Sequence, residues 1–443
     1  MLLLILLLIS LFLFLPTIFH ILFKEVRWNW EDINLNKISF PNSFIWGTAT
    51  ASHQVEGGCV NNWSEFEKGY KENGDPNIKD SQISGDACDN WNRYLEDIKL
   101  IKNLGVSHYR FSLEWSKIEP QMGRYNHDAI KHYSNIIDEL ISNGIQPVVT
   151  LHHFTHPIWF DDIGGFEKKE NIAYLVSFSE RVFNEYSDRV EHWCTINEPG
   201  VVSIQGYLTG MFPPGLKNGK KAGEVYKNLL ESHVQIYHKL KKHRNADKVK
   251  IGIVKNINQF EPWRRFNLFD WLFTLAMNHI FNWSAIKFFK TGKLKFRLPG
   301  IMWKTHTNKN AKKSLDFFGL NYYSHNHIRF NPFSKDFSDL MYKPSDTLTD
   351  MPYVIYAEGI YEAIKLVSTL GCPIIITENG VADKSDKIRS EYIEKYLYAV
   401  RKSIRDGYNV VGYYYWSLMD NFEWAFGYDM KFGLYEVDFE TQD

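Results

Sequence analysis

The sequence predicts an α/β fold in which eight parallel strands and their crossover helices close into a single (β/α)8 barrel. Short apolar runs rich in β-branched and aromatic residues recur along the chain. Longer segments with apolar residues at three- and four-residue spacing separate them. This alternation is typical of repeated strand–helix units and a parallel sheet, and eight such runs imply a closed barrel.

The expected strands follow from the apolar runs. In chain order they are Phe44–Ala51, Val106–Trp115, Gln146–Phe154, Val190–Pro199, Lys250–Ile257, Phe317–Tyr323, Pro373–Gly380 and Val410–Asp420. The expected helices are Trp91–Leu104, Ala129–Asn143, Ala173–Asp188, Val225–His243, Glu358–Leu370 and Glu391–Arg405. Glycines placed just past several of these helices suit their C-termini, namely Gly105, Gly144, Gly371 and Gly407.

Two long insertions interrupt the regular alternation, at Cys59–Asp86 and at Asn258–Thr307. Long loops after barrel strands usually shape the mouth of the site. The second insertion is rich in aromatic and basic residues, such as Trp263, Arg264 and Arg265. We favour an extra helix packed on the barrel. The alternative is a surface that faces the leaving group of a substrate or contacts a membrane.

Composition favours one large catalytic domain that binds a neutral small molecule. The chain has 443 residues, 44% of them hydrophobic, and a net charge of -1. That balance offers no basic field for nucleic acid. Four scattered cysteines show no spacing of a metal site, so we predict neither a metal nor a cofactor. No sequence pattern addresses the oligomeric state.

The N-terminus differs from the rest of the chain. Residues 1–23 form a hydrophobic segment, and a helix over Leu2–Phe23 would be long enough to span a bilayer. No Lys or Arg precedes the run and no clear cleavage site ends it, so we favour an uncleaved anchor over a signal peptide. Either interpretation places the protein at a membrane or in the secretory pathway. Topology stays open, because Lys24 and Arg27 suggest a cytoplasmic domain, whereas the sequons at Asn62 and Asn282 matter only in a secretory lumen.

Two predicted strands end in a carboxylate. The fourth closes with Thr195-Ile196-Asn197-Glu198-Pro199 and the seventh with Ile376-Thr377-Glu378-Asn379-Gly380. A charge at the tip of an apolar strand is costly unless it is paired or used. Glycoside hydrolysis needs two carboxyl groups across the scissile bond, and both strand ends would face the same side of a barrel. The pair therefore predicts this chemistry.

Further motifs make the chain resemble the family 1 glycoside hydrolases, which include β-glucosidases and β-galactosidases. The matching stretches are Phe44-Ile45-Trp46-Gly47-Thr48-Ala49-Thr50-Ala51-Ser52-His53-Gln54-Val55-Glu56-Gly57, Tyr109-Arg110-Phe111-Ser112 and Trp416-Ser417-Leu418-Met419-Asp420-Asn421-Phe422-Glu423-Trp424. The resemblance covers Ile38 to Gln442 and implies a TIM-barrel glycosidase domain at residues 38–443.

The resemblance implies roles for individual residues. Glu198 would be the general acid/base and Glu378 the nucleophile of a retaining mechanism. Arg110 would keep Glu378 ionised, with Asn321 and Tyr323 forming hydrogen bonds around it. Burial and the charge of Glu378 would keep Glu198 protonated before the reaction.

The resemblance also implies a sugar-binding site. Its residues would be Gln54, His153, Asn197, Trp416, Glu423 and Trp424. Asn197 would bind the 2-hydroxyl and Trp416 would stack on the sugar. His152 should point to the opposite face of its strand and serve packing. Glu423 argues for unphosphorylated sugars, because a carboxylate there would repel a phosphate, and Glu198 argues for ordinary O-glycosides.

The chain departs from the family pattern at three places. Phe154 and Thr155 replace a tryptophan and an aspartate that are common there, which puts hydroxyl recognition near O3 in question. Lys431 stands where an arginine is common. After the eighth strand the family usually continues through a last helix, whereas this sequence ends at Thr441-Gln442-Asp443, so we expect either a fragment or a less stable domain without that helix. Without that helix, apolar surface beside the first and eighth strands would be exposed.

Three functions are compatible with these residues. The leading one is hydrolysis of β-glucosides or related β-D-glycosides, including glycolipids if residues 2–23 hold the protein at a membrane. The second is transglycosylation, in which a sugar or lipid hydroxyl takes the place of water. The third is a non-catalytic glycan-binding barrel, which the presence of both glutamates disfavours.

Overall fold

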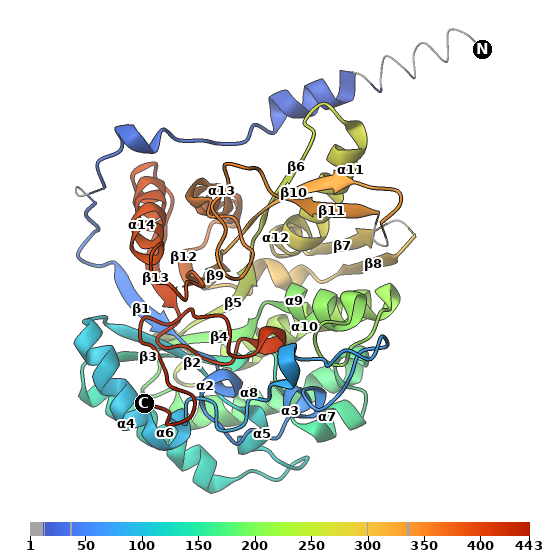
Figure 1. The fold of residues 1–443 in the computed structure, drawn as a ribbon. Coiled ribbons are helices and arrows are strands. Elements are labelled where there is room, and N and C mark those ends of the chain that lie inside the picture. The colour runs from blue at the N-terminus through green and yellow to red at the C-terminus, as the bar shows by residue number, and fades with distance from the viewer. Residues whose placement is uncertain (1–11, 13, 36–37, 299, 335–336) are drawn as a thin grey trace.

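Eight parallel strands form a closed barrel in the computed structural model, which describes residues 12, 14–35, 38–298, 300–334 and 337–443 (Figure 1). Each strand pairs with its neighbours in the order β1-β2-β3-β4-β5-β9-β12-β13 and back to β1. Their bounds are β1 (Ile45–Ala49), β2 (His108–Ser112), β3 (Gln146–His152), β4 (His192–Asn197), β5 (Lys250–Asn256), β9 (Phe317–Asn321), β12 (Ile374–Asn379) and β13 (Val410–Trp416). All eight predicted strands, and the barrel, are confirmed.

The six predicted crossover helices are also confirmed. They are α4 (Asn90–Leu104), α6 (His127–Ser142), α8 (Ile172–Tyr186), α10 (Gly219–Leu240), α13 (Ala357–Ser368) and α14 (Arg389–Arg405). Gly105 ends α4 with φ of 77°, a conformation that strains any residue with a side chain. Shorter helices lie in the loops after strands: α2 (Ser52–Val55), α3 (Asn62–Phe66), α5 (Trp115–Ile118), α7 (Ile158–Asp162) and α9 (Pro199–Ile204).

Several strands end earlier than their apolar runs. The eighth was expected to reach Asp420, but β13 ends at Trp416. The run continues because the following loop is buried: Leu418 and Met419 are 0% and 3% exposed. Because this loop is buried, its sequence is as apolar as that of a strand, and the predicted strand is too long. The described residues after β13, through 443, contain no further α-helix.

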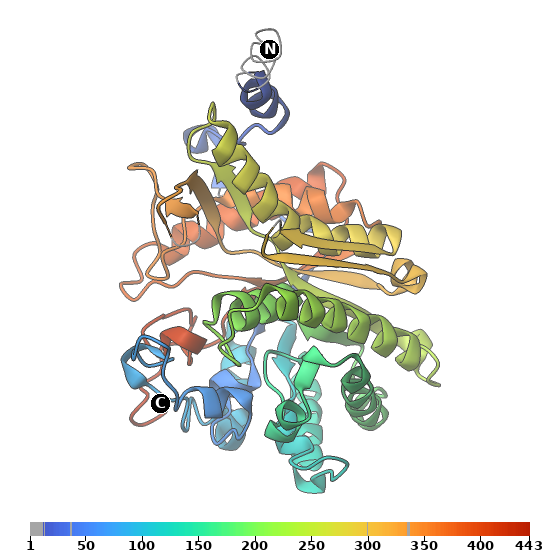
Figure 2. The same cartoon turned by 90° about the vertical axis from the view of Figure 1, so that its right-hand side faces the viewer.

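The second insertion contains more than the single helix we favoured. It forms β6 (Gln259–Pro262), α11 (Leu268–Asn278), α12 (Ser284–Thr291) and a hairpin of β7 (Lys293–Leu298) and β8 (Met302–Thr307). β6 pairs with β10 (His325–Phe330), which pairs with β11 (Ser338–Met341). Figure 2 shows this small sheet and α11 together on one side of the barrel.

The N-terminal segment runs over that same side before it enters β1 (Figure 1). Residues 14–22 are helical, and the rings of Phe19 and Phe23 lie 5.6 Å and 5.9 Å from that of Trp271 in α11. Farther along, Glu358 of α13 accepts hydrogen bonds from the Trp28 amide and the Trp30 indole. These contacts hold residues 24–35 against the helices around the barrel.

Most of the anchor predicted at residues 1–23 lies outside the described part of the chain, which omits residues 1–11 and 13. Among the helices that the structure does describe, none combines the length and the apolar character needed to cross a bilayer.

Close packing of α13 on β9 gives a stability prediction. A Cβ added at Gly359 would lie 1.7 Å from Oη of Tyr322, which follows β9. Alanine normally stabilises a helix interior relative to glycine, but here overpacking should dominate and destabilise the protein by about 1–3 kcal/mol or more. Denaturant midpoints would measure this. Gly371→Ala is the control, since a Cβ at Gly371 would meet open space and only its φ of 77° is unfavourable. Unchanged stability of Gly359→Ala would contradict the packing described.

Candidate active site

All eleven predicted site residues gather at the C-terminal ends of the barrel strands. Parallel strands in a closed barrel end on the same face, so residues distant in sequence meet there. The contributions are Arg110 in β2, His153 after β3, Asn197 and Glu198 at the end of β4, Asn321 and Tyr323 at the end of β9, Glu378 in β12, Trp416 in β13, Gln54 in α2, and Glu423 with Trp424 after β13.

Both oxygens of Glu378 are held by donors. Arg110 Nη1 donates to Oε1 at 2.7 Å and the Tyr323 hydroxyl donates to Oε2 at 2.8 Å. The register of β12 shifts at this point against both neighbouring strands, and such irregularities redirect side chains. Two donors and a guanidinium charge stabilise the ionised carboxylate in a position that is only 4% exposed.

Arg110 organises the floor of the site. It is fully buried, and a buried cation is stable only when its donors are used. Besides Glu378, it donates to Thr150 Oγ1 at 3.1 Å, to the Thr377 carbonyl at 3.2 Å and to Asn197 Oδ1 at 2.8 Å. Burial alone would lower the pKa of Arg110, but the charge of Glu378 raises it overall. The guanidinium of Arg110 therefore connects β2 with β3, β4 and β12.

Asn321 links this network to the second carboxyl group. Thr377 Oγ1 donates to Asn321 Oδ1 at 2.7 Å, which turns Asn321 Nδ2 toward Glu198 Oε1, 2.8 Å away. The same nitrogen lies 3.3 Å from Asn197 Oδ1. Because Oε1 of Glu198 accepts this bond, Oε2 is the oxygen left to carry a proton.

Glu198 stands in a different environment from Glu378. It precedes α9 with a left-handed φ of 45° and is 8% exposed. Burial, and then the negative charge of Glu378, raise its pKa to about 8. The carboxyl is therefore protonated at neutral pH. The two neighbouring carboxyl groups thus differ in environment, since Glu378 accepts from Arg110 and Tyr323 whereas the proton of Glu198 is favoured by burial and by the charge of Glu378.

A buried lysine next to Glu198 was missed by the sequence analysis. Lys255, at the end of β5, is 1% exposed and its ammonium donates to Asn256 O at 2.6 Å and Oδ1 at 2.7 Å. Its side chain reaches toward α9, since a Cβ on Gly200 would lie 3.2 Å from Nζ. Burial lowers the pKa of Lys255 to about 7, and its charge lowers the pKa of Glu198. A lysine inside the apolar run Lys250–Ile257 was the signal that could have identified it.

Gln54 and Glu423 form a second polar group in the site. Gln54 Nε2 donates to Glu423 Oε2 at 3.2 Å and to Asn421 Oδ1 at 2.8 Å. Burial, followed by the charge of Glu378, raises the pKa of Glu423 to about 8. Gln54 Oε1 is buried and has no hydrogen-bond partner among the described residues.

His153 has a buried hydrogen-bond donor that is also without a partner, as the acceptor of Gln54 is. Its Nε2 accepts from Asn197 Nδ2 at 3.0 Å, so the ring proton lies on Nδ1, which is buried without a described partner. Burial lowers the pKa of His153 well below its usual range, so the ring is neutral. Its plane is near-parallel to the rings of Trp416 and Trp424, at 5.9 Å and 6.0 Å. Unsatisfied buried polar atoms are rare in proteins. The acceptor Gln54 Oε1 and the donor His153 Nδ1 can therefore both form hydrogen bonds with a polar ligand.

The residues at which the chain departs from the family pattern have identifiable contacts. The Phe154 ring packs against Trp424 at 5.0 Å and offers no polar group. Thr155 Oγ1 donates to Glu114 Oε2 at 2.9 Å. His152 stacks with His156, outside the network, as expected for a packing role. Lys431 forms an ion pair with Asp420 Oδ2 at 3.4 Å, which does not explain why it replaces an arginine.

The network uses no cluster of metal ligands. In the described ranges of the chain, the only group of His, Cys, Asp or Glu side chains placed to hold a metal is Glu25, His325 and His327. The other residues that the sequence analysis overlooked are Thr150 and Thr377, whose hydroxyls order Arg110 and Asn321.

Comparison with known proteins places the chain among glycosidases. It matches the Glycosyl hydrolase family 1 over residues 36–443. Beta-glucosidase A of Acetivibrio thermocellus is 34% identical, over 92% of this chain and 95% of the relative. Furostanol glycoside 26-O-beta-glucosidase of Hellenia speciosa is 32% identical, over 92% and 80%.

Solved structures agree. A beta-glycosidase from Pyrococcus horikoshii has 38% identity and a TM-score of 0.81, covering 92% of both chains. A beta-glucosidase from Thermotoga maritima in complex with glucoimidazole has 32% identity and a TM-score of 0.83, covering 91% of this chain and 95% of that one.

Two substitutions should move the pKa of Glu198 in opposite directions. Glu378→Gln removes the negative charge that raises it, so the value should fall below about 8. Lys255→Met removes a positive charge that lowers it, so the value should rise. Carbon-13 NMR titration of labelled glutamate, with Glu198→Gln to assign the signal, would measure both. Lys227→Met is the control, because Lys227 is buried but paired with Glu224 at 2.8 Å. Shifts of the same sign in both variants would refute this electrostatic account.

Proposed function

The chain belongs to glycosyl hydrolase family 1 and is a retaining β-glycosidase, and we propose that Glu378 is its nucleophile and Glu198 its general acid/base. The observation that carries this assignment is the difference between the two carboxyl groups. Glu378 accepts from Arg110 and Tyr323, whereas burial and the charge of Glu378 raise the pKa of Glu198 to about 8. Glu378 can therefore attack the anomeric carbon as a carboxylate, and Glu198 can donate a proton to the leaving oxygen.

In the first step, a carboxylate oxygen of Glu378 forms a bond to the anomeric carbon while the bond to the leaving oxygen breaks. Glu198 transfers its proton to that oxygen, so the aglycone departs as a neutral alcohol. Charge on Glu378 is consumed in the new ester bond. Since that charge is one cause of the raised pKa of Glu198, the pKa should fall in the glycosyl-enzyme.

In the second step, Glu198 is then a carboxylate and acts as the base. It takes a proton from water, whose oxygen bonds to the anomeric carbon as the bond to Glu378 breaks. Glu378 regains its charge, and the pKa of Glu198 rises again. The same pair of side chains therefore alternates between acid and base because the charge of one sets the proton affinity of the other.

We propose that the sugar hydroxyls complete the unsatisfied polar groups. Gln54 Oε1 and His153 Nδ1 are the buried acceptor and donor without described partners. Asn197 would bind the 2-hydroxyl next to the anomeric carbon, and Trp416 would stack on the sugar face. Glu423 and Trp424 would bind the remaining hydroxyls, and the carboxyl of Glu423 favours unphosphorylated sugars. Relatives named as beta-glucosidases favour a β-glucoside substrate.

Activity measurements on two variants test the assignment. Glu378→Ala should lower kcat by about 10⁴-fold or more for every substrate, since the nucleophile is absent. Glu198→Ala should cost about 10²–10⁴-fold with alkyl β-glucosides but far less in the first step with a dinitrophenyl β-glucoside, whose leaving group needs no proton. Glu191→Ala, an exposed glutamate before β4, is the control. Retained activity of Glu378→Ala would exclude the mechanism.

We also propose that the N-terminal segment holds the enzyme at a lipid surface. Large apolar side chains are exposed on the N-terminal helix, including Phe14 at 64% and Leu22 at 68%, and on α11 and the loop before it, including Phe266 at 70%. Residues 1–11 add a further apolar stretch by sequence. A contiguous apolar surface with aromatic residues suits the lipid interface. Glycolipids are then accessible substrates, and a lipid hydroxyl could replace water as acceptor.

Vesicle flotation tests the lipid proposal. The full chain should float with phosphatidylcholine vesicles, and product analysis there would distinguish transfer from hydrolysis. Replacing the exposed Phe14, Ile18 and Ile21 by Ser should sharply reduce flotation, because each buried methylene contributes about 0.8 kcal/mol. Trp303→Ser, which changes an exposed tryptophan on β8, should float like the wild type. A wild-type chain that does not float would rule the proposal out.

A further inference from the structure

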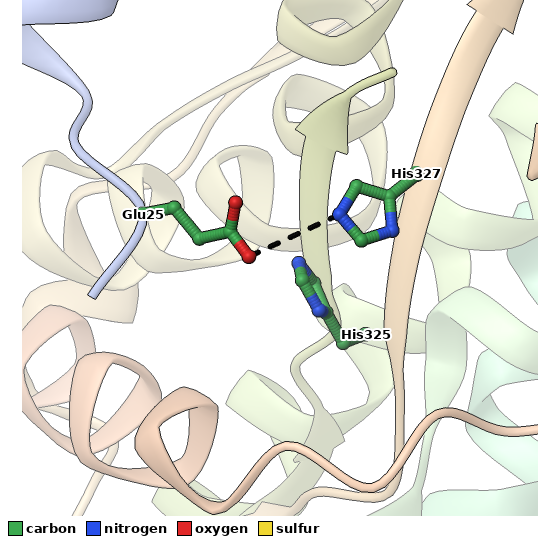
Figure 3. Close-up of side chains that lie close together, drawn as sticks. All are labelled: Glu25, His325 and His327. Carbon is green, nitrogen blue, oxygen red and sulfur yellow. Dashed lines mark ion pairs between the residues drawn. The ribbon is translucent and has the colours of Figure 1, made fainter. Parts of the chain in front are cut away.

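Two histidines and a glutamate face one another where the N-terminal segment meets the small sheet (Figure 3). His325 and His327 lie on β10 with one residue between them, so strand alternation directs both rings to the same face. They are 0% and 1% exposed. Glu25 approaches from the N-terminal segment, about three hundred residues away in sequence, with its side chain 13% exposed.

Neither imidazole has a hydrogen-bond partner among the described residues. Nδ1 and Nε2 of both His325 and His327 are buried and unsatisfied. A neutral imidazole has one donor and one acceptor nitrogen, and burying both without partners is costly. Every neutral imidazole keeps one unprotonated nitrogen, which can act as a metal ligand.

The distances suit a small cation. One ligand atom from each of the three side chains lies within 4.8 Å of the others. Nε2 of His327 is 4.0 Å from Oε1 of Glu25, and the ligands of a tetrahedral Zn²⁺ lie about 3.3 Å apart. On the other side of His327, Nδ1 is 3.9 Å from Asp346 Oδ2. This carboxylate is too far from Nδ1 for a hydrogen bond, but its negative charge lies on the side of the cluster opposite Glu25.

Charge around the cluster is balanced. Arg27 and Lys343 pair with Glu25, and Arg265 pairs with Glu261 at 2.7 Å while lying 4.0 Å from Glu25. A cation must therefore compete for Oε1 with Arg27 and also with Lys343, whose Nζ lies 3.2 Å from that oxygen. The Arg27 side chain is 46% exposed and its guanidinium also lies 4.8 Å above the Tyr356 ring. It can leave Glu25 for water, while Lys343 keeps its 3.0 Å contact with Oε2.

We propose that Glu25, His325 and His327 form a binding site for a divalent transition-metal ion such as Zn²⁺. The ligand set, two imidazoles and one carboxylate with a water in the fourth position, favours zinc-like ions over Mg²⁺ and Ca²⁺, which prefer oxygen ligands. The bound ion joins the N-terminal segment to β10. It therefore secures a segment that otherwise depends on ion pairs and on the contacts of Trp28 and Trp30.

Metal titration of the full chain tests this proposal. After treatment with a chelator, calorimetry should show one Zn²⁺ bound per chain and no comparable binding of Mg²⁺. Co²⁺ in its place should give the visible absorption of a tetrahedral nitrogen and oxygen site. His327→Ala and Glu25→Gln should each weaken Zn²⁺ binding by about tenfold or more. His127→Ala, which removes an exposed histidine of α6, should not change it.

A variant that should bind Zn²⁺ more tightly keeps the test valid even if the histidine variants fail to fold. Arg27→Ala keeps all three ligands and removes the competing guanidinium, so its affinity for Zn²⁺ should increase severalfold. Thermal unfolding should shift upward with Zn²⁺ in the wild type and in Arg27→Ala. Absence of saturable binding in the wild type, or equal binding in His327→Ala and Glu25→Gln, would overturn the proposal and leave water as the partner of these rings.

Discussion

The buried ion pair between Arg110 and Glu378 is the interaction on which the rest of the site depends. Its two members come from β2 and β12, which are not neighbours in the barrel. Breaking such a pair would leave a charge without compensation in the interior, at a cost of about 3–5 kcal/mol. The remaining donors of Arg110 must also be satisfied, and they hold Thr150, Thr377 and Asn197 in place. Asn197 in turn orients His153, so one guanidinium orders both the reacting and the sugar-binding parts.

The position of that guanidinium also distinguishes the three carboxyl groups of the site. Glu198, Glu378 and Glu423 share one buried region, but only Glu378 has an arginine at hydrogen-bond distance. Burial, and then the negative charge of Glu378, raise the pKa of Glu198 and that of Glu423 to about 8. Lys255 acts in the opposite direction on Glu198. The proton affinity of the acid therefore results from a balance between a neighbouring anion and a buried cation, which changes when the nucleophile forms its ester bond.

The region outside the barrel is connected to this site through β9 and β10. Tyr323, which binds Glu378, is followed after one residue by His325, where β10 begins. That strand carries the two unpartnered imidazoles that face Glu25. The apolar surface of the N-terminal helix packs on α11, in the same insertion that supplies β6. Attachment to a lipid surface and the proposed metal site would thus both act on the segment that covers this side of the barrel.

The amino-acid sequence predicted the barrel from its apolar runs and the two glutamates from polar motifs at the ends of parallel strands, which must share one face. The other nine residues of the candidate site were predicted from the resemblance to family 1 glycoside hydrolases, and the structure places them beside the two glutamates. Other features follow only from the three-dimensional arrangement of the chain. The pairing of β6 with β10, the influence of Lys255 on Glu198 and the meeting of Glu25 with His325 and His327 join residues far apart in the chain. Their properties arise from burial and from charges brought close in space, which no spacing along a sequence records.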